Sequence, residues 1–306
     1  MAKVFIDGSA GTTGLRISER LGARADISLL RLPEEHRKDL NARLDAIHQA
    51  DVSFLCLPDE AAKQIAAAAG EGCTIIDTST AHRINPDWVY GFAELPGQRD
   101  KIAASSRIAN PGCHASGFVS LVAPLVHSGL IAGDTALTCF SLTGSSGGGK
   151  KMIAQYEDPN RDPLLSAPRQ YGLTQAHKHL PEMVKLCGLT ASPVFCPIVA
   201  DFYSGMEVTV SLFRDQVQGN LSDIADCYRS LYTGSLVRYE AHADPDGLLS
   251  AASMSGRDDM TVSVFGNDDR ILLVSRFDNL GKGASGAAIQ NMNIVLGLPE
   301  ETGLCL

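Results

Sequence analysis

The feature that most constrains folding is a glycine-rich turn between the first apolar stretch and the first amphipathic stretch. Residues 3–6 are a predicted strand, and residues 8–14 read GSAGTTG before a predicted helix that runs to about residue 21. Further predicted strands at 27–30, 52–57 and 73–76 alternate with helices, including an alanine-rich one at 60–69. This alternation predicts an α/β, Rossmann-like, doubly wound parallel sheet.

The second half of the chain has a different pattern. Apolar strands are predicted at 136–142, 207–213, 260–265 and 271–277, the last two flanking a hairpin loop at 266–270. Alternating apolar residues at 206, 208, 210 and 212 indicate an antiparallel strand with one covered face. A helix at 221–232 has Asn220 or Ser222 as its candidate N-cap. We therefore expect an α+β domain with a mainly antiparallel sheet.

Length, charge and cysteine pattern narrow the expected number of domains, the kinds of partner and the compartment. A chain of 306 residues suggests two domains, which we place at 1–113, completed by a C-terminal helical segment 284–306, and at 114–283. The net charge of −9 argues against nucleic-acid and anionic-membrane partners. Residues 108–133 carry no Asp, Glu, Lys or Arg, but Pro111 and Pro124 favour a buried helix over a membrane span. No secretory signal is recognisable and the eight cysteines form no CxxC pair, so we expect a cytoplasmic protein without disulfides or a cysteine zinc site.

The glycine turn has the context of a dinucleotide-binding loop. A strand precedes it and a helix N-terminus follows it, which suits close approach of a pyrophosphate; the candidate contacts are Gly8, Ser9, Gly11, Thr12, Thr13 and Gly14. A ligand-free glycine turn is the alternative. Arg31 ends the second predicted strand where an NAD enzyme usually has an acidic residue, and residues 37–38 add two cations. These cations favour NADP over NAD, unless they are simply a solvated basic surface.

Cys113 lies in the sequence Asn-Pro-Gly-Cys, directly before the charge-free helical stretch. The Pro-Gly turn places this cysteine at a helix N-terminus, where backbone N–H groups and the helix dipole favour the thiolate. The same amides could hold an oxyanion that forms when the thiolate attacks a carbonyl. A buried structural cysteine is the alternative.

Two further motifs are less specific. Residues 144–150 read GSSGGGK, which resembles a P-loop, but Lys151 replaces the Ser or Thr that would bind magnesium. We expect a mobile glycine loop near the active site instead. His177 and His179 form a His-x-His pair without a third nearby ligand, so we expect no metal site. They are either a structural pair or a general acid/base partner of Cys113.

Four segments together carry a family resemblance: residues 8–14, 110–113, 177–182 (HKHLPE) and 278–284 (DNLGKGA). In this order they resemble the short form of the N-acetyl-γ-glutamyl-phosphate reductases of arginine biosynthesis and, more distantly, the aspartate-semialdehyde dehydrogenases. The resemblance implies NADPH-dependent reduction of N-acetyl-glutamyl 5-phosphate to the semialdehyde and phosphate through a thioester on Cys113. It also implies a homo-oligomer, a tetramer or dimer, whose contacts and substrate site lie in the second domain. The chain departs from the family after the cysteine, where His114-Ala115-Ser116 replaces Tyr-Pro-Thr.

The resemblance also distributes roles. His177 and His179 match the family's histidine motif, and Asn279 would hold the nicotinamide carboxamide. Arg107 and Lys178 are candidate anchors for the substrate's carboxylate or phosphate, and Ser79 is a candidate cofactor contact. Two alternatives stay open: a related acyl-phosphate reductase of the aspartate or aminoadipate type, and a non-catalytic NADP-binding regulatory protein.

Overall fold

The computed structural model describes residues 1–244 and 246–306, which divide into two units. The first unit contains Met1–Ala93, Gly97–Pro111 and Ala284–Leu304; the second contains Glu94–Pro96, Gly112–Gly283 and Cys305–Leu306. The chain therefore enters the second unit at Gly112, just before Cys113, whereas the boundary predicted from the sequence lies just after Cys113. The last two residues also belong to the second unit.

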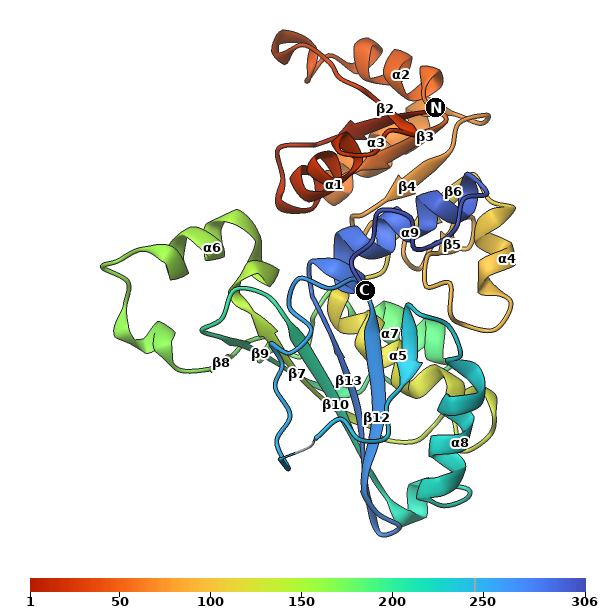
Figure 1. The fold of residues 1–306 in the computed structure, drawn as a ribbon, viewed down its shortest axis with the longest axis vertical. Helices are drawn as coiled ribbons and strands as arrows, with labels where there is room; N and C mark the ends of the chain where they lie inside the picture. The colour runs from red at the N-terminus through yellow and green to blue at the C-terminus, as the bar shows by residue number, and fades with distance from the viewer. Residues whose placement is uncertain (245) are drawn as a thin grey trace. The chain divides into compact units, whose positions relative to one another are not determined.

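The first unit is built on a fully parallel sheet, sheet A (Figure 1). Its strands, in spatial order, are β2 (Ile27–Leu30), β1 (Ala2–Asp7), β3 (Val52–Leu55), β4 (Ile75–Asp77), β6 (Arg107–Ala109) and β5 (Val89–Tyr90). Its helices are α1 (Thr12–Gly22), α2 (Leu40–Gln49), α3 (Asp59–Ala69), α4 (Gln98–Ala103) and α9 (Gly286–Val295). This is the doubly wound arrangement that the alternating strands and helices predict.

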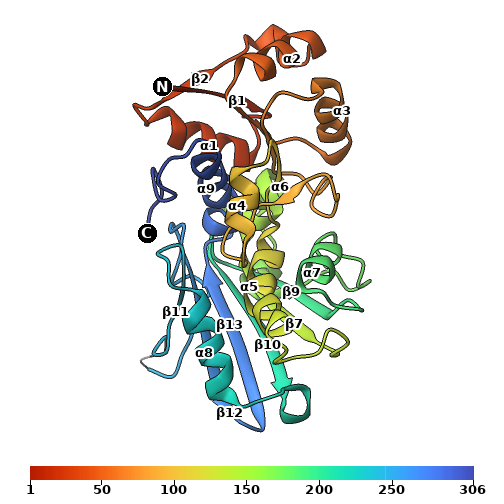
Figure 2. The same ribbon diagram turned by 90° about the vertical axis from the view of Figure 1, so that its right-hand side faces the viewer.

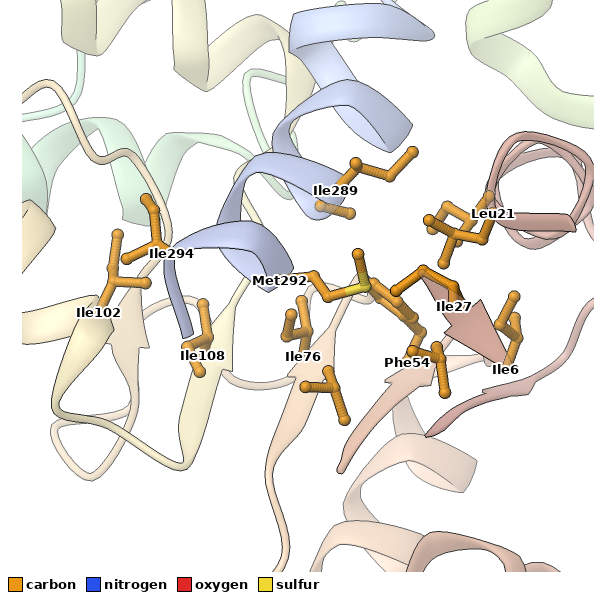
Figure 3. Packing of buried hydrophobic residues seen from close by; sticks show 14 of the residues in the cluster. Ile6, Leu21, Ile27, Phe54, Ile76, Ile102, Ile108, Ile289, Met292 and Ile294 are labelled. Atoms are coloured by element: carbon orange, nitrogen blue, oxygen red, sulfur yellow. The ribbon is translucent and has the colours of Figure 1, made fainter. Parts of the chain in front are cut away.

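Two apolar cores cover the two faces of sheet A. Val4 and Ile6 of β1 pack into one cluster together with residues of α1, α4 and α9, whereas Phe5 packs into a second cluster with residues of α2 and α3. Successive strand residues point to opposite faces, so this split follows from the two-residue period of a strand. Figure 3 shows Met292 of α9 beside Phe54 of β3 in the first cluster. Helix α9, near the C-terminus, thus completes an apolar core that includes β1 and α1 from the N-terminus.

The second unit is built on a mixed sheet, sheet B. Its strands, in spatial order, are β11 (Val237–Tyr239), β12 (Met260–Asn267), β13 (Arg270–Phe277), β10 (Met206–Phe213), β7 (Thr138–Gly144), β9 (Val194–Ala200) and β8 (Arg169–Gln170). The β11–β12 and β7–β9 pairs are parallel and the other four are antiparallel. The helices are α5 (Cys113–His127), α6 (Gly149–Glu157), α7 (Leu180–Cys187) and α8 (Leu221–Leu231), and α5 and α8 lie along one face of the sheet (Figure 2).

Helix α5 is the charge-free stretch and is buried along most of its length. Pro124 lies inside it and has no N–H to donate to the Ser120 carbonyl one turn earlier. The Tyr232 hydroxyl donates to that carbonyl at 2.6 Å, so the proline leaves no buried acceptor unpaired. Gly117 faces β10, where a Cβ atom would come within 2.4 Å of the Val208 side chain. These contacts fix the helix whose first residue is Cys113.

Local signals set several element ends. Asn220 caps α8, accepting hydrogen bonds from the N–H groups of Ser222 and Asp223, which settles the choice between Asn220 and Ser222. Strands β12 and β13 extend further into the hairpin than predicted, leaving a turn of two residues, 268–269. Residues 281–285 form a short π-helical turn before α9. The remaining short helical turns are 3-10 helices at Glu34–His36, Ser145–Gly148, Pro163–Ser166 and Arg214–Gln216.

Candidate functional site

Cys113 is the first residue of α5, and Gly112 is its N-cap in extended conformation. Cys113 is half-buried. Gly283 lies against it, and a Cβ atom at that position would come within 2.9 Å of the Cys113 Cβ. The first N–H groups of a helix have no partners within the helix and carry its positive dipole end. The predicted placement of Cys113 at a helix N-terminus is confirmed.

A glutamate that the sequence did not single out connects this turn to the histidine motif. Glu182 of α7 is 1% exposed and accepts a hydrogen bond from the Gly112 N–H at 3.1 Å. Its other carboxylate oxygen lies 3.9 Å from Nε2 of His179. One buried carboxylate therefore holds both the cysteine turn and one histidine.

Three histidine rings form a cluster in the second unit. The ring centres of His177 and His179 are 4.8 Å apart, and each lies 5.5 Å from the ring centre of His114. Nδ1 of His177 accepts a hydrogen bond from the His179 N–H at 3.2 Å. The structure thus brings His177 and His179 beside the residue that follows Cys113, although they are more than sixty residues away in the sequence.

His114 is buried at 3% exposure and contacts two hydroxyl groups. Its Nδ1 lies 2.6 Å from Ser141 Oγ and its Nε2 lies 2.7 Å from Tyr171 Oη. Burial first, and then the charges of His177 and Lys178, lower the pKa of His114 to about 3. The ring is therefore neutral at physiological pH. The sequence marks His114 as unusual, but nothing in it indicates Ser141 or Tyr171.

The glycine turn borders a cavity of about 350 Å³ in the first unit. Gly8, Ser9 and Arg31 are among its lining residues, as predicted for a cofactor site, and Arg37 and Lys38 line it too. Gly8 has φ +85°, which favours glycine, and a Cβ there would lie 2.3 Å from the Cys56 carbonyl oxygen. Other lining side chains supply apolar walls: Leu29, Leu30, Leu32 and Leu57. Apolar walls with a basic rim beside a helix N-terminus fit an adenine nucleotide with phosphate groups.

The other glycine-loop candidates form the start of α1. Gly11 is its N-cap, and the first helical residues, Thr12 and Thr13, include no acidic side chain that would repel an anion. A Cβ at Gly14 would lie 2.5 Å from the Gly8 carbonyl oxygen, so this glycine lets α1 close onto the loop. Arg43 pairs with the buried Asp7 carboxylate at 2.6 Å, so the last residue of β1 is neutralised beside the loop.

Arg107, a predicted substrate anchor, contacts backbone groups of the first unit. Its guanidinium group donates to the carbonyl oxygens of Gly70 and Cys73, at the end of α3 and in the turn that follows. It also lies over the Trp88 ring at 5.9 Å. Because Arg107 begins β6, it lies at the amino end of the parallel strands, whereas the glycine loop opens at their carboxyl end. These contacts give Arg107 a structural role at the amino end of sheet A, and its part in substrate binding stays a prediction.

Two other predicted contacts are already engaged within their units. The Ser79 hydroxyl donates to the buried Asp77 carboxylate at 2.7 Å, which also contacts His82 Nδ1 at 2.7 Å. The Asn279 amide donates to Ser146 Oγ and accepts from the Gly205 N–H, both at 2.9 Å. Asn279 is 2% exposed, so its side chain organises the turn after β13.

Lys178 and the second glycine-rich segment complete the candidates. The Lys178 side chain is exposed next to the histidine cluster. Residues 144–150 do not form the predicted loop: Gly144 ends β7, Ser145–Gly148 form a 3-10 helix, and residues 149–150 begin α6. In the part of the chain that the structure describes, no three His, Cys, Asp or Glu side chains are grouped to bind a metal, and no helix has the length and hydropathy that crossing a bilayer requires.

Comparison with known proteins places this architecture. Residues 3–105 match the family model of the semialdehyde dehydrogenase NAD binding domain, and residues 113–279 match that of the semialdehyde dehydrogenase dimerisation domain. Aspartate semialdehyde dehydrogenase II of Vibrio cholerae has the same fold, with a TM-score of 0.73 at 17% identity over 97% of this chain and 99% of its own. The NADP-bound aspartate semialdehyde dehydrogenase of Candida albicans gives a TM-score of 0.69 at 18% identity, over 97% of this chain and 98% of its own.

The sequence comparison is more specific than the structural one. The chain is 43% identical to the N-acetyl-gamma-glutamyl-phosphate reductase of Brucella ovis, over 96% of this chain and 99% of that protein. The alignment covers nearly the full length of both chains. The chain belongs to the N-acetyl-gamma-glutamyl-phosphate reductases, within the semialdehyde dehydrogenase family.

Proposed function

We propose that this protein reduces N-acetyl-γ-glutamyl phosphate to N-acetylglutamate semialdehyde and phosphate, using NADPH, as a step of arginine biosynthesis. The observation that carries the proposal is the half-buried Cys113 at the N-terminus of α5, joined through Glu182 to His179. A thiol at such a position is activated as a nucleophile. The substrate assignment rests on the 43% identity to a reductase of that name.

The reaction follows from what Cys113 can do. Its thiolate attacks the acyl carbon, the bond between that carbon and the phosphate oxygen breaks, and phosphate leaves, so that a thioester remains on the sulfur. NADPH, when bound, supplies the hydride that reduces this thioester. Breaking the carbon–sulfur bond then releases the aldehyde and restores the thiolate. First-turn N–H groups of α5 stabilise the negative oxygen that forms at each stage.

His177 and His179 take the proton-handling role in this proposal. A neutral imidazole accepts the thiol proton, and the resulting imidazolium stabilises the thiolate. Glu182 lies within 3.9 Å of His179 and would stabilise that imidazolium. Lys178, exposed beside the cluster, remains our candidate for binding a carboxylate or phosphate of the substrate.

The test uses the reverse reaction, phosphate-dependent oxidation of the semialdehyde. The wild-type protein should oxidise N-acetylglutamate semialdehyde with NADP in the presence of phosphate or arsenate, and aspartate semialdehyde far more slowly. Cys113→Ser should bind NADPH normally and show no oxidation. A preference for aspartate semialdehyde would overturn the substrate, and full activity of Cys113→Ser would overturn the covalent mechanism.

We propose NADP as the cofactor in preference to NAD. Arg31, Arg37 and Lys38 line the cavity beside the glycine loop and provide positive charge for a 2′-phosphate. Arg31→Ala should weaken NADPH binding about tenfold or more while NADH binding changes little. Arg99→Ala is the matched control, because Arg99 is paired with Glu300 and does not line the cavity. Equal losses for the two cofactors in Arg31→Ala would refute the assignment.

We also propose a homo-oligomer, a dimer or tetramer, formed through the face of sheet B opposite α5. Phe140, Val194 and Leu272 point to this face and are 42–55% exposed, and the half-buried Leu142 and Ile198 are neighbours on β7 and β9. An exposed apolar patch on a sheet face is typical of a protein interface. Phe140→Asp should lower the mass measured by light scattering. Leu40→Asp is the control, because Leu40 is an exposed apolar residue at the start of α2 in the first unit and does not lie on this face.

None of the eight cysteines, all of which lie in the described part of the chain, forms a disulfide, which suits a reducing compartment. We therefore propose that the protein acts in the cytoplasm on a small-molecule substrate, without a nucleic-acid or membrane partner.

A further inference from the structure

His114 has no role in the reaction as described above, although it follows Cys113 directly and is buried beside both catalytic candidates, His177 and His179. Its two ring nitrogens contact Ser141 Oγ at 2.6 Å and Tyr171 Oη at 2.7 Å. The ring is neutral, so one nitrogen carries a hydrogen and the other is an acceptor. The position of this hydrogen decides whether the Tyr171 hydroxyl donates to the ring or accepts from it.

Ser141 determines the tautomer. Its hydroxyl is fully buried, and His114 Nδ1 is its sole side-chain hydrogen-bond partner in the described part of the chain. If Nδ1 carried the hydrogen, the serine hydrogen would be buried without an acceptor, which is costly. Ser141 therefore donates to Nδ1, and the hydrogen of the ring is on Nε2.

The hydrogen on Nε2 then donates to the oxygen of Tyr171. The hydroxyl hydrogen of Tyr171 is left free to donate in another direction, because among the described residues its oxygen has no other hydrogen-bond partner. The Tyr171 ring centre is 6.0 Å from that of His177, so the phenol lies at the histidine cluster. Burial first, and then the negative charge of Cys113, raise the pKa of the Tyr171 phenol, so it keeps its hydrogen at neutral pH.

We propose that Tyr171 donates a hydrogen bond to the oxygen of the acyl group carried by Cys113, and that His114, fixed by Ser141, is the positioning residue that orients this donor. The oxygen gains negative charge when the thioester is reduced, and a preorganised neutral donor stabilises that charge. No proton has to leave Tyr171 for this effect. The inference rests on the proposed function, because it needs an acyl group on Cys113.

The kinetic test is a double-mutant cycle on the forward reaction. Tyr171→Phe should lower kcat about 100-fold and leave KM within about threefold, because the lost interaction strengthens only as negative charge develops. His114→Phe should cause a similar loss, and the double variant should be no worse than Tyr171→Phe. His114→Gln, which can still present an N–H to the phenol, should recover most of kcat. Tyr239→Phe on β11 is the matched control, because its ring packs on Arg229.

Wild-type kcat in Tyr171→Phe, or losses that multiply in the double variant, would overturn the inference. Circular dichroism and NADPH binding of each variant identify a folding defect. If Tyr171→Phe does not fold, 3-fluorotyrosine incorporation replaces it: a more acidic phenol at position 171 should alter kcat and its pH profile, and an unchanged profile would overturn the proposal.

A second readout does not need turnover. Nitrogen-15 NMR of histidine-labelled protein should show His114 as the Nε2–H tautomer from pH 5 to 8, and Ser141→Ala should produce a mixture of tautomers. The Nδ1–H tautomer in the wild-type protein would refute the positioning argument. If the wild-type protein does not turn over N-acetyl-γ-glutamyl phosphate, the proposed function fails. The tautomer of His114 still shows whether the Tyr171 hydroxyl donates its hydrogen to a group other than His114.

Discussion

The glycine loop offers a prediction whose size can be worked out from the structure. Gly8→Ala should destabilise the first unit for two separate reasons. Gly8 has φ +85°, a conformation that costs an L-residue about 1–2 kcal/mol. The added Cβ would also lie 2.3 Å from the Cys56 carbonyl oxygen, and relieving such a contact with backbone costs roughly 1–3 kcal/mol. The free energy of unfolding should therefore fall by about 2–5 kcal/mol.

Gly72→Ala is the matched control. Gly72 has φ +89°, and an added Cβ would meet nothing within 4 Å. Only the conformational cost of about 1–2 kcal/mol should remain. The difference between the two variants isolates the close approach of the loop to the end of β3.

The assay is urea unfolding followed by the fluorescence of Trp88, the single tryptophan, which belongs to the same unit as the loop and stacks on His82. NADPH binding is measured in parallel by the fluorescence of the nucleotide. Gly8→Ala should also weaken NADPH binding, and Gly72→Ala should leave it unchanged. Equal losses of stability in the two variants, or unchanged NADPH binding in Gly8→Ala, would refute the role given to this glycine.

Three further outcomes are expected. Arg43→Met should lower the free energy of unfolding by roughly 3–5 kcal/mol at pH 7, because it leaves the Asp7 carboxylate buried without its cation. The loss should be smaller at pH 4.5, where a protonated Asp7 needs no cationic partner. A loss of stability that does not depend on pH would contradict this. The pKa of His114 is lowered to about 3 in the folded state, so between pH 6.5 and 3 the unfolded state binds one proton more than the folded state. The free energy of unfolding should therefore fall by up to about 5 kcal/mol on acidification across that window. The plots of unfolding free energy against pH for the wild-type protein and His114→Gln should diverge there; parallel plots would contradict this. Gln175→Ala should lower the melting temperature, since the amide makes two hydrogen bonds to the backbone of Phe195; an unchanged melting temperature would show that this contact is dispensable.

The parts of this fold that the sequence predicts are those with local causes. The parallel sheet follows from alternating strands and helices, and the positions of Cys113 and Asn220 at helix starts follow from a Pro-Gly turn and a capping side chain. Patterns of this kind are complete within about ten residues. They required no knowledge of what each element would pack against.

The parts that were missed depend on residues that meet only in the folded chain. Glu182 reaches the Gly112 N–H from 70 residues away, and Tyr171 reaches His114 from 57 residues away. Arg107 is close to Cys113 in the sequence, yet β6 separates it from the carboxyl end of the sheet. No local pattern carries these distances, because they are set by strand order and by which helix faces which strand.

The glycine-rich segment before α6 shows the opposite error. Its glycines predicted a loop, but the segment turns through a 3-10 helix into α6, with Gly149 at φ +70° as the first residue of that helix. The residues that follow, from Lys150 onward, are good helix formers and include the buried Tyr156, whose packing stabilises the helix. Packing of the downstream residues outweighs the local preference of the glycines.

The claim at the centre of this account is that Cys113 carries the acyl group. The protein mixed with N-acetyl-γ-glutamyl phosphate in the absence of NADPH should gain the mass of one N-acetylglutamyl group, which peptide mapping should locate on Cys113. Hydroxylamine should remove the added mass, and NADPH should discharge it as the semialdehyde. Cys113→Ser should show no thioester. An adduct on any other cysteine, or turnover of substrate without acylation of Cys113, would contradict the account.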